Sequence, residues 1–363
     1  MCITNSSKYN TNQPIIYFGF NDPREFKRGV ENVIYLQASC FTQNKCIYIF
    51  FGKKKELFKW GNLICFSIPK NTYRFFSVNY LLYWLKKKYN TTLFIHSHNY
   101  LTSFFCIKKT DVFTVHDGLV YSKKQAKSAF IFFFVIIERI TYWRSHKIHF
   151  ISAYAKSKAL YNSSKDVIIY NSSLLRVPVQ IANNKQHNPI KKILIVRSIE
   201  ERAALYLILQ FAQHLQQHYG NSVVIEIAGK GPLLDYYKKQ VATQQLKNVS
   251  FLGYITDDLL VEKYSECFLV MVPALYGEGF GLPVIEAYKF NKPVLASHVC
   301  AIPEVIISKK HLFNNTLPDI IDAFELFITD NAYLPNFRGY YNTHFSTELI
   351  KEKYLSLLYN DVR

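Results

Sequence analysis

Two glutamates stand on either side of a glycine-rich segment, and this pattern carries the clearest chemistry in the chain. The run between Glu278 and Glu286 begins with Gly279, Phe280, Gly281, Leu282 and Pro283. Glycines let a phosphate approach the backbone, and the free N–H groups of a helix start attract anions. Carboxylates beside such a site are poor phosphate ligands but good acceptors for hydroxyl groups. The pattern predicts a nucleotide-sugar site, with the diphosphate on the glycine loop, hexose hydroxyls on Glu278 and ribose on Glu286.

The neighbouring elements are expected to place this loop at the start of a helix. The apolar run from Cys267 to Val272 is typical of a buried strand. Pro283 suits the first helical position, because its φ is fixed and its missing N–H would have no partner there. Glu286 is then expected in the first helical turn and Glu278 in the loop, across the bound group. The alternative is an ordinary strand, loop and helix with two incidental glutamates.

The same stretch resembles the donor-site motif of glycosyltransferase family 4, the group 1 glycosyl transferases. The matching residues are Glu278–Ala287, Pro293–Val294 and Ile302–Val305. Asn291 replaces a glycine that is usual in the family, in a turn where asparagine also tolerates a left-handed backbone. The resemblance implies an α/β protein of the GT-B fold, with two Rossmann-like doubly wound parallel-sheet domains facing a cleft. It also implies sugar transfer with retention of configuration. The sequence shows no metal-binding carboxylate pair, so no metal or other cofactor is expected.

Strands and helices alternate along the chain with short turns, which is typical of parallel doubly wound sheets. Residues 1–180 are expected to form an acceptor-binding domain and residues 190–340 a nucleotide-sugar-binding domain. The polar, proline-bounded residues 179–189 are the expected linker. The resemblance implies that the terminal helix within residues 341–363 crosses back to the first domain.

The resemblance also implies donor contacts elsewhere in the second half. Arg197 and Arg202 have the spacing of the family's arginine and lysine on the donor diphosphate, and arginine keeps the charge while adding a bidentate fork. The turn at Gly229 and Gly231 matches the family's G-x-G turn. The next expected strand is 249–255, and the residues that directly follow its Gly253 border the nucleobase in the family. The ribose and nucleobase contacts are thus expected from Glu286, Tyr254, Ile255, Gly229 and Gly231.

Histidines follow two predicted strands of the first half. His96 and His98 follow the strand at 92–95, and His116 follows the strand at 111–115. Ligands of parallel sheets bind at the carboxyl ends of strands, so these histidines are expected on the functional edge. The resemblance implies that His116 faces the sugar at the reaction centre, where it and Glu278 are the candidate catalytic residues. A histidine that only caps its strand is the alternative, and no metal site is predicted because a third ligand is missing nearby.

The loop after the first predicted strand is the candidate acceptor loop. The resemblance places Lys27, Arg28 and Gly29 near a bound sugar, where the two cations would contact a phosphate of donor or acceptor. The family often has two consecutive glycines here, but this chain keeps only Gly29. A solvated loop without a ligand is the alternative.

The net positive charge of the chain lies in its first half. Residues 1–189 carry 27 of the 44 Lys and Arg but only 8 of the 26 Asp and Glu, so the first half has a balance of +19 and the second half of −1. This asymmetry predicts a polyanionic partner. An anionic membrane surface is favoured over nucleic acid, because the cations are not gathered into a recognisable nucleic-acid-binding module. A solvated basic face without a partner is the remaining alternative.

Two aromatic-rich predicted helices, at 73–89 and 128–147, suit either a domain core or a membrane interface. The longest apolar run, at 129–137, is shorter than the roughly 20 residues of a spanning helix. The chain start is polar without a signal-peptide pattern, and the seven cysteines are dispersed, as in a reducing compartment. The expected location is the cytoplasm, peripheral on the inner face of the cytoplasmic membrane.

Together these patterns predict a retaining transferase that moves a hexose from a nucleotide-diphospho-sugar to a growing glycan. The expected acceptor is a glycan or a lipid-diphosphate-linked intermediate of a bacterial surface polysaccharide, such as an O-antigen or capsule. A nucleotide-sugar epimerase or a phosphorylase of the same fold is one alternative. A basic nucleic-acid-binding protein is another, and salt-sensitive binding of DNA or RNA without nucleotide-sugar binding would favour it.

Overall fold

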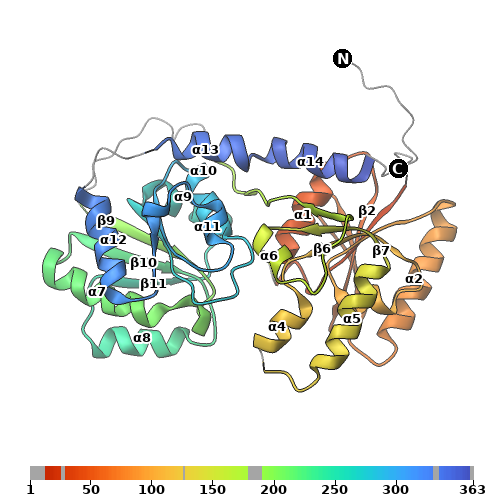
Figure 1. Ribbon diagram of the computed structural model, residues 1–363, viewed down its shortest axis with the longest axis horizontal. Coiled ribbons are helices and arrows are strands. Elements are labelled where there is room, and N and C mark those ends of the chain that lie inside the picture. The colour runs from red at the N-terminus through yellow and green to blue at the C-terminus, as the bar shows by residue number, and fades with distance from the viewer. Residues whose placement is uncertain (1–12, 26–28, 126, 179–189, 330–334, 360–363) are drawn as a thin grey trace, which may run out of the picture. The chain divides into compact units, whose positions relative to one another are not determined.

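The computed structural model describes residues 13–25, 29–125, 127–178, 190–329 and 335–359, which belong to two compact units (Figure 1). Unit 1 comprises residues 1–171 and 347–363, and unit 2 comprises residues 172–346. Each unit is built on its own sheet. The last helix is blue in Figure 1, and it belongs to the same unit as the red and orange start of the chain.

Unit 1 has an eight-stranded sheet in the order β3-β4-β2-β1-β5-β6-β7-β8. Its strands are β1 (Ile15–Phe18), β2 (Cys46–Gly52), β3 (Glu56–Trp60), β4 (Leu63–Pro69), β5 (Phe94–Ser97), β6 (Thr110–Val115), β7 (Ser145–Phe150) and β8 (Asp166–Ile168). All neighbouring pairs are parallel except β3 and β4, which form an antiparallel hairpin at the edge. The carboxyl ends of the parallel strands therefore meet at one edge of the sheet.

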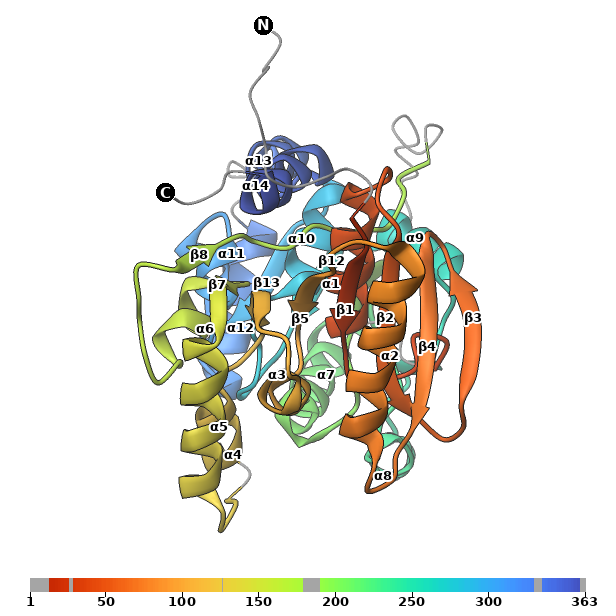
Figure 2. The same cartoon turned by 90° about the vertical axis from the view of Figure 1, so that its right-hand side faces the viewer.

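The helices of unit 1 cover this sheet. They are α1 (Val30–Cys40), α2 (Arg74–Tyr89), α3 (Tyr100–Phe105), α4 (Leu119–Gln125), α5 (Ile131–Trp143), α6 (Ala153–Ser157) and α14 (Thr347–Tyr359). Figure 2 shows α2 lying along β1 and β2, where Val78, Leu82 and Leu85 pack with isoleucines of those strands. These three positions follow helical spacing, so α2 buries one stripe and exposes the other.

Unit 2 has a fully parallel six-stranded sheet in the order β11-β10-β9-β12-β13-β14. Its strands are β9 (Lys191–Val196), β10 (Val223–Ala228), β11 (Val249–Gly253), β12 (Leu269–Val272), β13 (Val294–Ser297) and β14 (Leu312–Phe313). Its helical segments are η2 (Glu201–Ala203), α7 (Leu205–Tyr219), α8 (Leu234–Thr243), α9 (Asp257–Glu266), α10 (Leu282–Lys289), α11 (Ile302–Val305), η3 (Lys309–His311), α12 (Leu317–Thr329) and α13 (Phe337–His344). α7 packs its apolar face on β9 and β10 and forms much of the core.

The alternation of parallel strands and helices confirms the predicted α/β fold class. The β3–β4 hairpin was not predicted, and it makes one edge of the first sheet antiparallel. The predicted helix at 128–147 is too long at both ends. α5 spans only Ile131–Trp143, and Ser145 already starts β7. No helix in the described part of the chain is long and apolar enough to cross a membrane.

Candidate functional site

The glycine loop of unit 2 connects β12 to α10, as the sequence predicts. Gly281 precedes the first residue of α10 with φ of 92°, a left-handed conformation that favours glycine. The Glu278 Oε1 atom accepts the Gly281 N–H at 3.1 Å, and the Glu278 carbonyl accepts the Ala301 N–H at 3.2 Å. Glu278 therefore stabilises the conformation of the loop, and its carboxylate also faces neighbouring charged side chains.

Arg197 follows β9 and approaches the same loop. Its Nη1 atom lies 3.2 Å from Glu278 Oε2, and its side chain is only 6 % exposed. Its Nε and Nη1 atoms have no hydrogen-bond partner in the described residues. Burial lowers the pKa of Arg197, and the nearby Glu278 carboxylate opposes this shift. A buried guanidinium with unfilled donors beside a helix start is suited to an oxyanion.

Arg202 lies in η2 and is tied to the segment that enters the glycine loop. Its Nη1 atom donates to the Gly277 carbonyl at 2.8 Å, and its Nε atom donates to Glu200 at 3.3 Å. The positive charge of Arg202 also lowers the pKa of Arg197, so the two guanidinium groups lie close together. The structure thus brings both predicted phosphate-binding arginines to Glu278 and its loop.

The two predicted glycines after β10 are fixed by backbone packing. A Cβ atom on Gly229 would lie 1.7 Å from the Arg197 carbonyl oxygen, and one on Gly231 would lie 2.1 Å from the Ile199 carbonyl oxygen. The Arg197 N–H donates to the Ala228 carbonyl at 3.0 Å. The turn therefore supports the segment that carries Arg197, and contact with ribose or nucleobase stays a prediction.

Tyr254 and Ile255 follow β11 and differ in exposure. The Tyr254 ring is 46 % exposed, with the Lys230 Nζ atom 5.5 Å from its centre, whereas Ile255 is buried. The Gly253 carbonyl accepts the Gly229 N–H at 2.7 Å, which places Tyr254 next to the glycine turn. An exposed aromatic ring with a neighbouring cation can stack on a base. Contact of Tyr254 with the nucleobase stays a prediction.

The position predicted for Glu286 is wrong. α10 begins at Leu282, so Glu286 is its fifth residue and lies beyond the first turn, which has no acidic residue. The Glu286 side chain is buried, and its Oε2 atom accepts the Tyr264 hydroxyl at 2.8 Å. Phe280 is also buried, with its ring centre 6.1 Å from that of Phe345, so its side chain does not face a bound diphosphate.

In unit 1, His116 belongs to a cluster of four histidines. Its Nε2 atom lies 2.8 Å from His98 Nδ1, and His98 Nε2 lies 3.0 Å from Gln37 Oε1. His96 Nε2 lies 2.7 Å from the Thr114 hydroxyl, which lies 2.9 Å from His149 Nδ1. The His96 and His98 rings stack at 5.0 Å. The three predicted histidines therefore do meet at the carboxyl edge of the sheet.

All four imidazoles are held neutral. Burial lowers the pKa of His116 to about 3 and that of His149 to about 4. Burial and the neighbouring histidines lower the pKa of His96 and His98 well below the usual value. If two of these rings were charged, they would repel each other strongly at this site of low dielectric. The network therefore suits hydrogen bonds between neutral rings.

The candidate acceptor loop is described only in part. Lys27 and Arg28 lie outside the described residues. Gly29 has φ of 86°, a left-handed conformation, and its carbonyl accepts the Val33 N–H at the start of α1. Burial raises the pKa of Glu31, the first acidic residue of α1, which accepts a hydrogen bond from the Asn21 amide.

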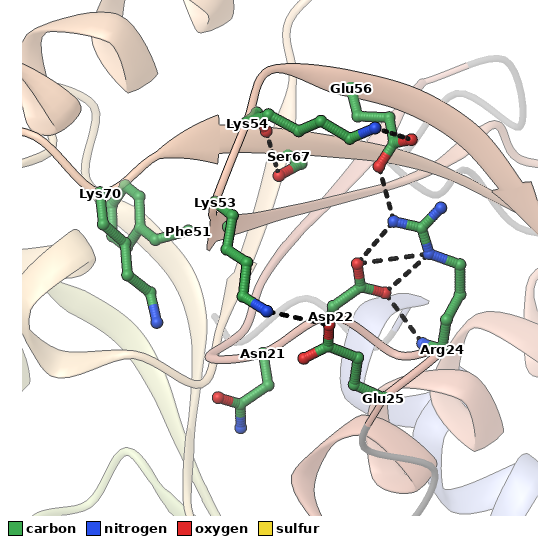
Figure 3. Close-up of a pocket in the computed structure, with 11 residues that line it drawn as sticks. Asn21, Asp22, Arg24, Glu25, Phe51, Lys53, Lys54, Glu56, Ser67 and Lys70 are labelled. Carbon is green, nitrogen blue, oxygen red and sulfur yellow. Dashed lines mark hydrogen bonds and ion pairs between the residues drawn. The ribbon is translucent and has the colours of Figure 1, made fainter.

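A pocket opens beside this loop, at the carboxyl ends of β2 and β4 (Figure 3). Arg24 bridges Asp22 and Glu56 with two 2.6 Å contacts. Lys53 lies 3.9 Å from Glu25, whereas Lys70 has no ion pair within the described ranges. The remaining lining residues are Asn21, Phe51, Gly52, Lys54 and Ser67. The lining therefore mixes carboxylates with cations, and the sequence patterns did not indicate it.

The six-stranded parallel sheet with its flanking helices defines unit 2 as a Rossmann-like domain. Residues 179–341 match the family model of group 1 glycosyl transferases. The match confirms the resemblance that was predicted from the motif. Among curated relatives, the serotype-specific mannosyltransferase WbdA of Escherichia coli is 30% identical over 162 residues. That alignment covers 43% of this chain and 20% of WbdA.

Two solved structures share the fold over nearly the whole chain. Sucrose-phosphate synthase from Thermosynechococcus elongatus has a TM-score of 0.75 at 17% identity, covering 96% of this chain and 98% of its own. HepE of Anabaena, solved in complex with UDP and glucose, has a TM-score of 0.71 at 15% identity, covering 96% and 100%. These likenesses confirm the predicted GT-B fold.

The sequence patterns missed Gln37, Thr114 and His149 as members of the histidine cluster. Gln37 lies in α1 and His149 in β7, so neither adjoins a histidine in the sequence. His149 lies between Ile148 and Phe150, and a histidine between two apolar residues of a strand is the signal that would have singled it out.

Proposed function

We propose that this chain is a retaining glycosyltransferase that moves a hexose from a nucleotide-diphospho-sugar to a growing glycan. The observation that carries the proposal is Arg197, a buried guanidinium with unfilled donors at the start of α10, in a domain that matches the model of the group 1 family. Such a group has lost its hydration, and an oxyanion can restore its hydrogen bonds. In group 1 glycosyl transferases, this oxyanion would be the diphosphate of the nucleotide-sugar donor.

Charge development at the leaving diphosphate gives each residue a role. Arg197, Arg202 and the amides of Gly279 to Leu282 stabilise the leaving group electrostatically as its negative charge grows. Glu278 binds hexose hydroxyls, and Glu286 is assigned the ribose. His116 faces the transferred sugar, and the mechanism requires no divalent metal. These residues act by fixed charges and hydrogen-bond donors, which need no rearrangement during transfer.

The acceptor is assigned to unit 1. The pocket of Figure 3 combines Asp22, Glu56 and Glu25 with arginine and lysines, a lining suited to sugar hydroxyls and to an anionic group. WbdA is named a serotype-specific mannosyltransferase, which supports a surface polysaccharide as product. We therefore assign a glycan or lipid-diphosphate-linked acceptor of a bacterial O-antigen or capsule pathway.

We further propose a peripheral position on an anionic membrane surface in the cytoplasm. The outer face of α2 exposes Tyr73, Phe76 and Tyr80 and ends with Lys86–Lys88. Large aromatic side chains with lysines beside them are typical of interfacial helices. Phe132 of α5 is similarly exposed, and Lys123 of α4 lies 5.0 Å from the ring of Phe134.

The donor can be identified by thermal shift against UDP-, GDP- and dTDP-hexoses in the presence of a chelator. A hexose nucleotide at about 100 times its dissociation constant should stabilise the protein by about 2.7 kcal/mol. HepE was solved with UDP and glucose, so UDP-hexoses are tested first. Arg197→Met should abolish the shift, because it removes the guanidinium that would bind the diphosphate, and thermal unfolding without ligand checks that the variant still folds.

Lys192→Met is the matched control, since it removes a cation of the same strand that pairs instead with Glu266. It should bind the donor like the unmodified protein. Binding by Arg197→Met equal to that of the control would overturn the proposed site. Consumption of the donor without any acceptor would point to an epimerase instead of a transferase.

A further inference from the structure

We propose that His98 is a positioning residue for His116, which it holds in the tautomer that carries its proton on Nε2 and offers Nδ1 to a substrate hydroxyl. The inference rests on the proposed transferase function, and it extends that function to residues inside the sheet. His98 comes from the end of β5, His116 from the end of β6 and Gln37 from α1. The three side chains form one continuous line of hydrogen bonds.

The proton positions follow from the end of this line. In the amide orientation of this structure, Gln37 turns its Oε1 atom to His98, and an oxygen can only accept, so His98 Nε2 carries the proton at the 3.0 Å contact. A neutral His98 then has a lone pair on Nδ1, and His116 Nε2 must donate to it across 2.8 Å. The remaining nitrogen of His116, Nδ1, is left unprotonated.

That nitrogen is available for a ligand. His116 Nδ1 has no hydrogen bond to any described residue, and the His116 side chain is only partly buried at the carboxyl edge of the sheet. His98 and Gln37, in contrast, are almost completely buried. A hydroxyl that donates to His116 Nδ1 is therefore held by a ring whose orientation and tautomer are fixed from behind.

A second line of hydrogen bonds connects His149, Thr114 and His96, and its rings are protonated on the same nitrogen as those of the first line. The Ile169 carbonyl can only accept, so His149 carries its proton on Nε2 at the 2.9 Å contact. Thr114 then donates to His149 Nδ1 and accepts from His96 Nε2. His96 Nδ1 is buried without a partner, as expected for a ring that is unprotonated there. Both lines therefore consist of neutral rings protonated on Nε2.

The tautomer can be measured without substrate. In protein labelled with ¹⁵N-histidine, imidazole nitrogen shifts separate protonated from unprotonated positions, and His116→Gln assigns the signals. We expect His116 to be neutral with its proton on Nε2. In His98→Leu, which removes the acceptor, we expect a mixture of His116 tautomers. A His116 proton on Nδ1, or an unchanged tautomer in His98→Leu, would overturn the proposal.

Transfer kinetics supply the second measurement. His98→Leu should lower kcat by about tenfold or more, the usual loss when an orienting partner is removed, with little change in the donor KM. His98→Asn places an amide oxygen near the former Nδ1 position and should recover most of the rate. Equal losses in the two variants, after both are shown to fold by thermal unfolding, would reduce His98 to a packing residue and overturn the proposal.

The two measurements also separate this inference from the proposed function. If the unmodified protein binds no nucleotide-sugar and transfers no sugar, the proposed function fails, while the nitrogen shifts still decide whether His98 sets the His116 tautomer. If transfer is observed but the shifts place the proton on Nδ1, the proposed function stands and the positioning role of His98 is wrong.

Discussion

At Gly229, the turn after β10 runs directly against the carbonyl of Arg197. Gly229→Ala must push the two segments apart, because a Cβ atom would lie 1.7 Å from that oxygen. We expect a loss of several kcal/mol in the free energy of unfolding, beyond the ~1–2 kcal/mol of left-handed backbone strain alone. Donor binding should weaken as well, because Arg197 moves. Urea unfolding and donor titration measure the two effects.

Gly220→Ala is the control for this substitution. Gly220 also has a positive φ, of 57°, but a Cβ atom there would meet nothing within 4 Å. It should cost only the backbone strain and leave donor affinity unchanged. Equal destabilisation by the two variants would show that the contact with Arg197 carries no weight.

Residue positions could be predicted where they depend on local spacing, and not where they depend on long-range contacts. Arg197, Glu278 and the glycine loop lie close together because each ends or follows a parallel strand of one sheet. Glu286 was placed one turn too early, because the exact start of α10 decides which face of the helix it occupies. The link between Gln37 and His98 spans 61 positions of sequence, so no local pattern contains it.

At the scale of elements, the exposed face of α2 tests the membrane proposal. Phe76 and Tyr80 are one helical turn apart on this face, and both are more than half exposed. Phe76→Glu combined with Tyr80→Glu should reduce co-sedimentation with anionic vesicles, because it removes interfacial aromatic area and adds like charge. The residual binding should fall further as salt rises.

Leu326→Glu on α12 is the control, since it changes an exposed apolar residue of the nearly neutral second half. It should sediment like the unmodified protein. Unchanged sedimentation of the α2 variant would exclude this face as the membrane contact. If substitutions at Phe132 and Phe133 reduced binding instead, α5 would be the interfacial helix.

Elements with a strong apolar period were predicted well, and short or edge elements were not. The strand at 111–115 and the helix at 73–89 carry their own apolar signal and match β6 and α2 closely. β3 was missed because its strand pattern sits next to a lysine run and a Gly61 turn at the sheet edge, where one face is solvated. α5 was overextended because an apolar run does not show where a helix stops and the next strand begins.

At the scale of the whole molecule, the charge asymmetry and the buried histidines both belong to the first half of the chain. The cationic excess can be read from the sequence, because it is a sum over residues. The histidine cluster cannot, because a pKa depends on burial and neighbours that only the fold creates. The pH dependence of folding stability therefore follows from the pKa values of histidines buried in the folded sheet.

His149→Gln tests this pH dependence with a definite sign. Burial lowers the pKa of His149 to about 4 in the folded state, below the usual value near 6.5. As pH falls below about 6.5, the unfolded chain takes up a proton that the folded protein rejects, so the stability present at neutral pH is lost. The variant lacks this proton uptake. It should be less stable at neutral pH, and its deficit should shrink by about 1.4 kcal/mol per pH unit on acidification.

Shifted carboxyl groups are common to both proteins, so their contributions cancel in the comparison. Burial raises the pKa of Glu31 and Glu138, so these carboxyls act with the opposite sign, but they act equally in the variant and in the unmodified protein. His146→Gln, at an exposed position of the same strand, should give a stability curve parallel to that of the unmodified protein. Urea unfolding between about pH 7 and pH 5 measures the three curves. A His149→Gln deficit that stays constant with pH would mean that His149 is charged in the folded sheet, and the all-neutral arrangement from which the His116 tautomer was inferred would then fail.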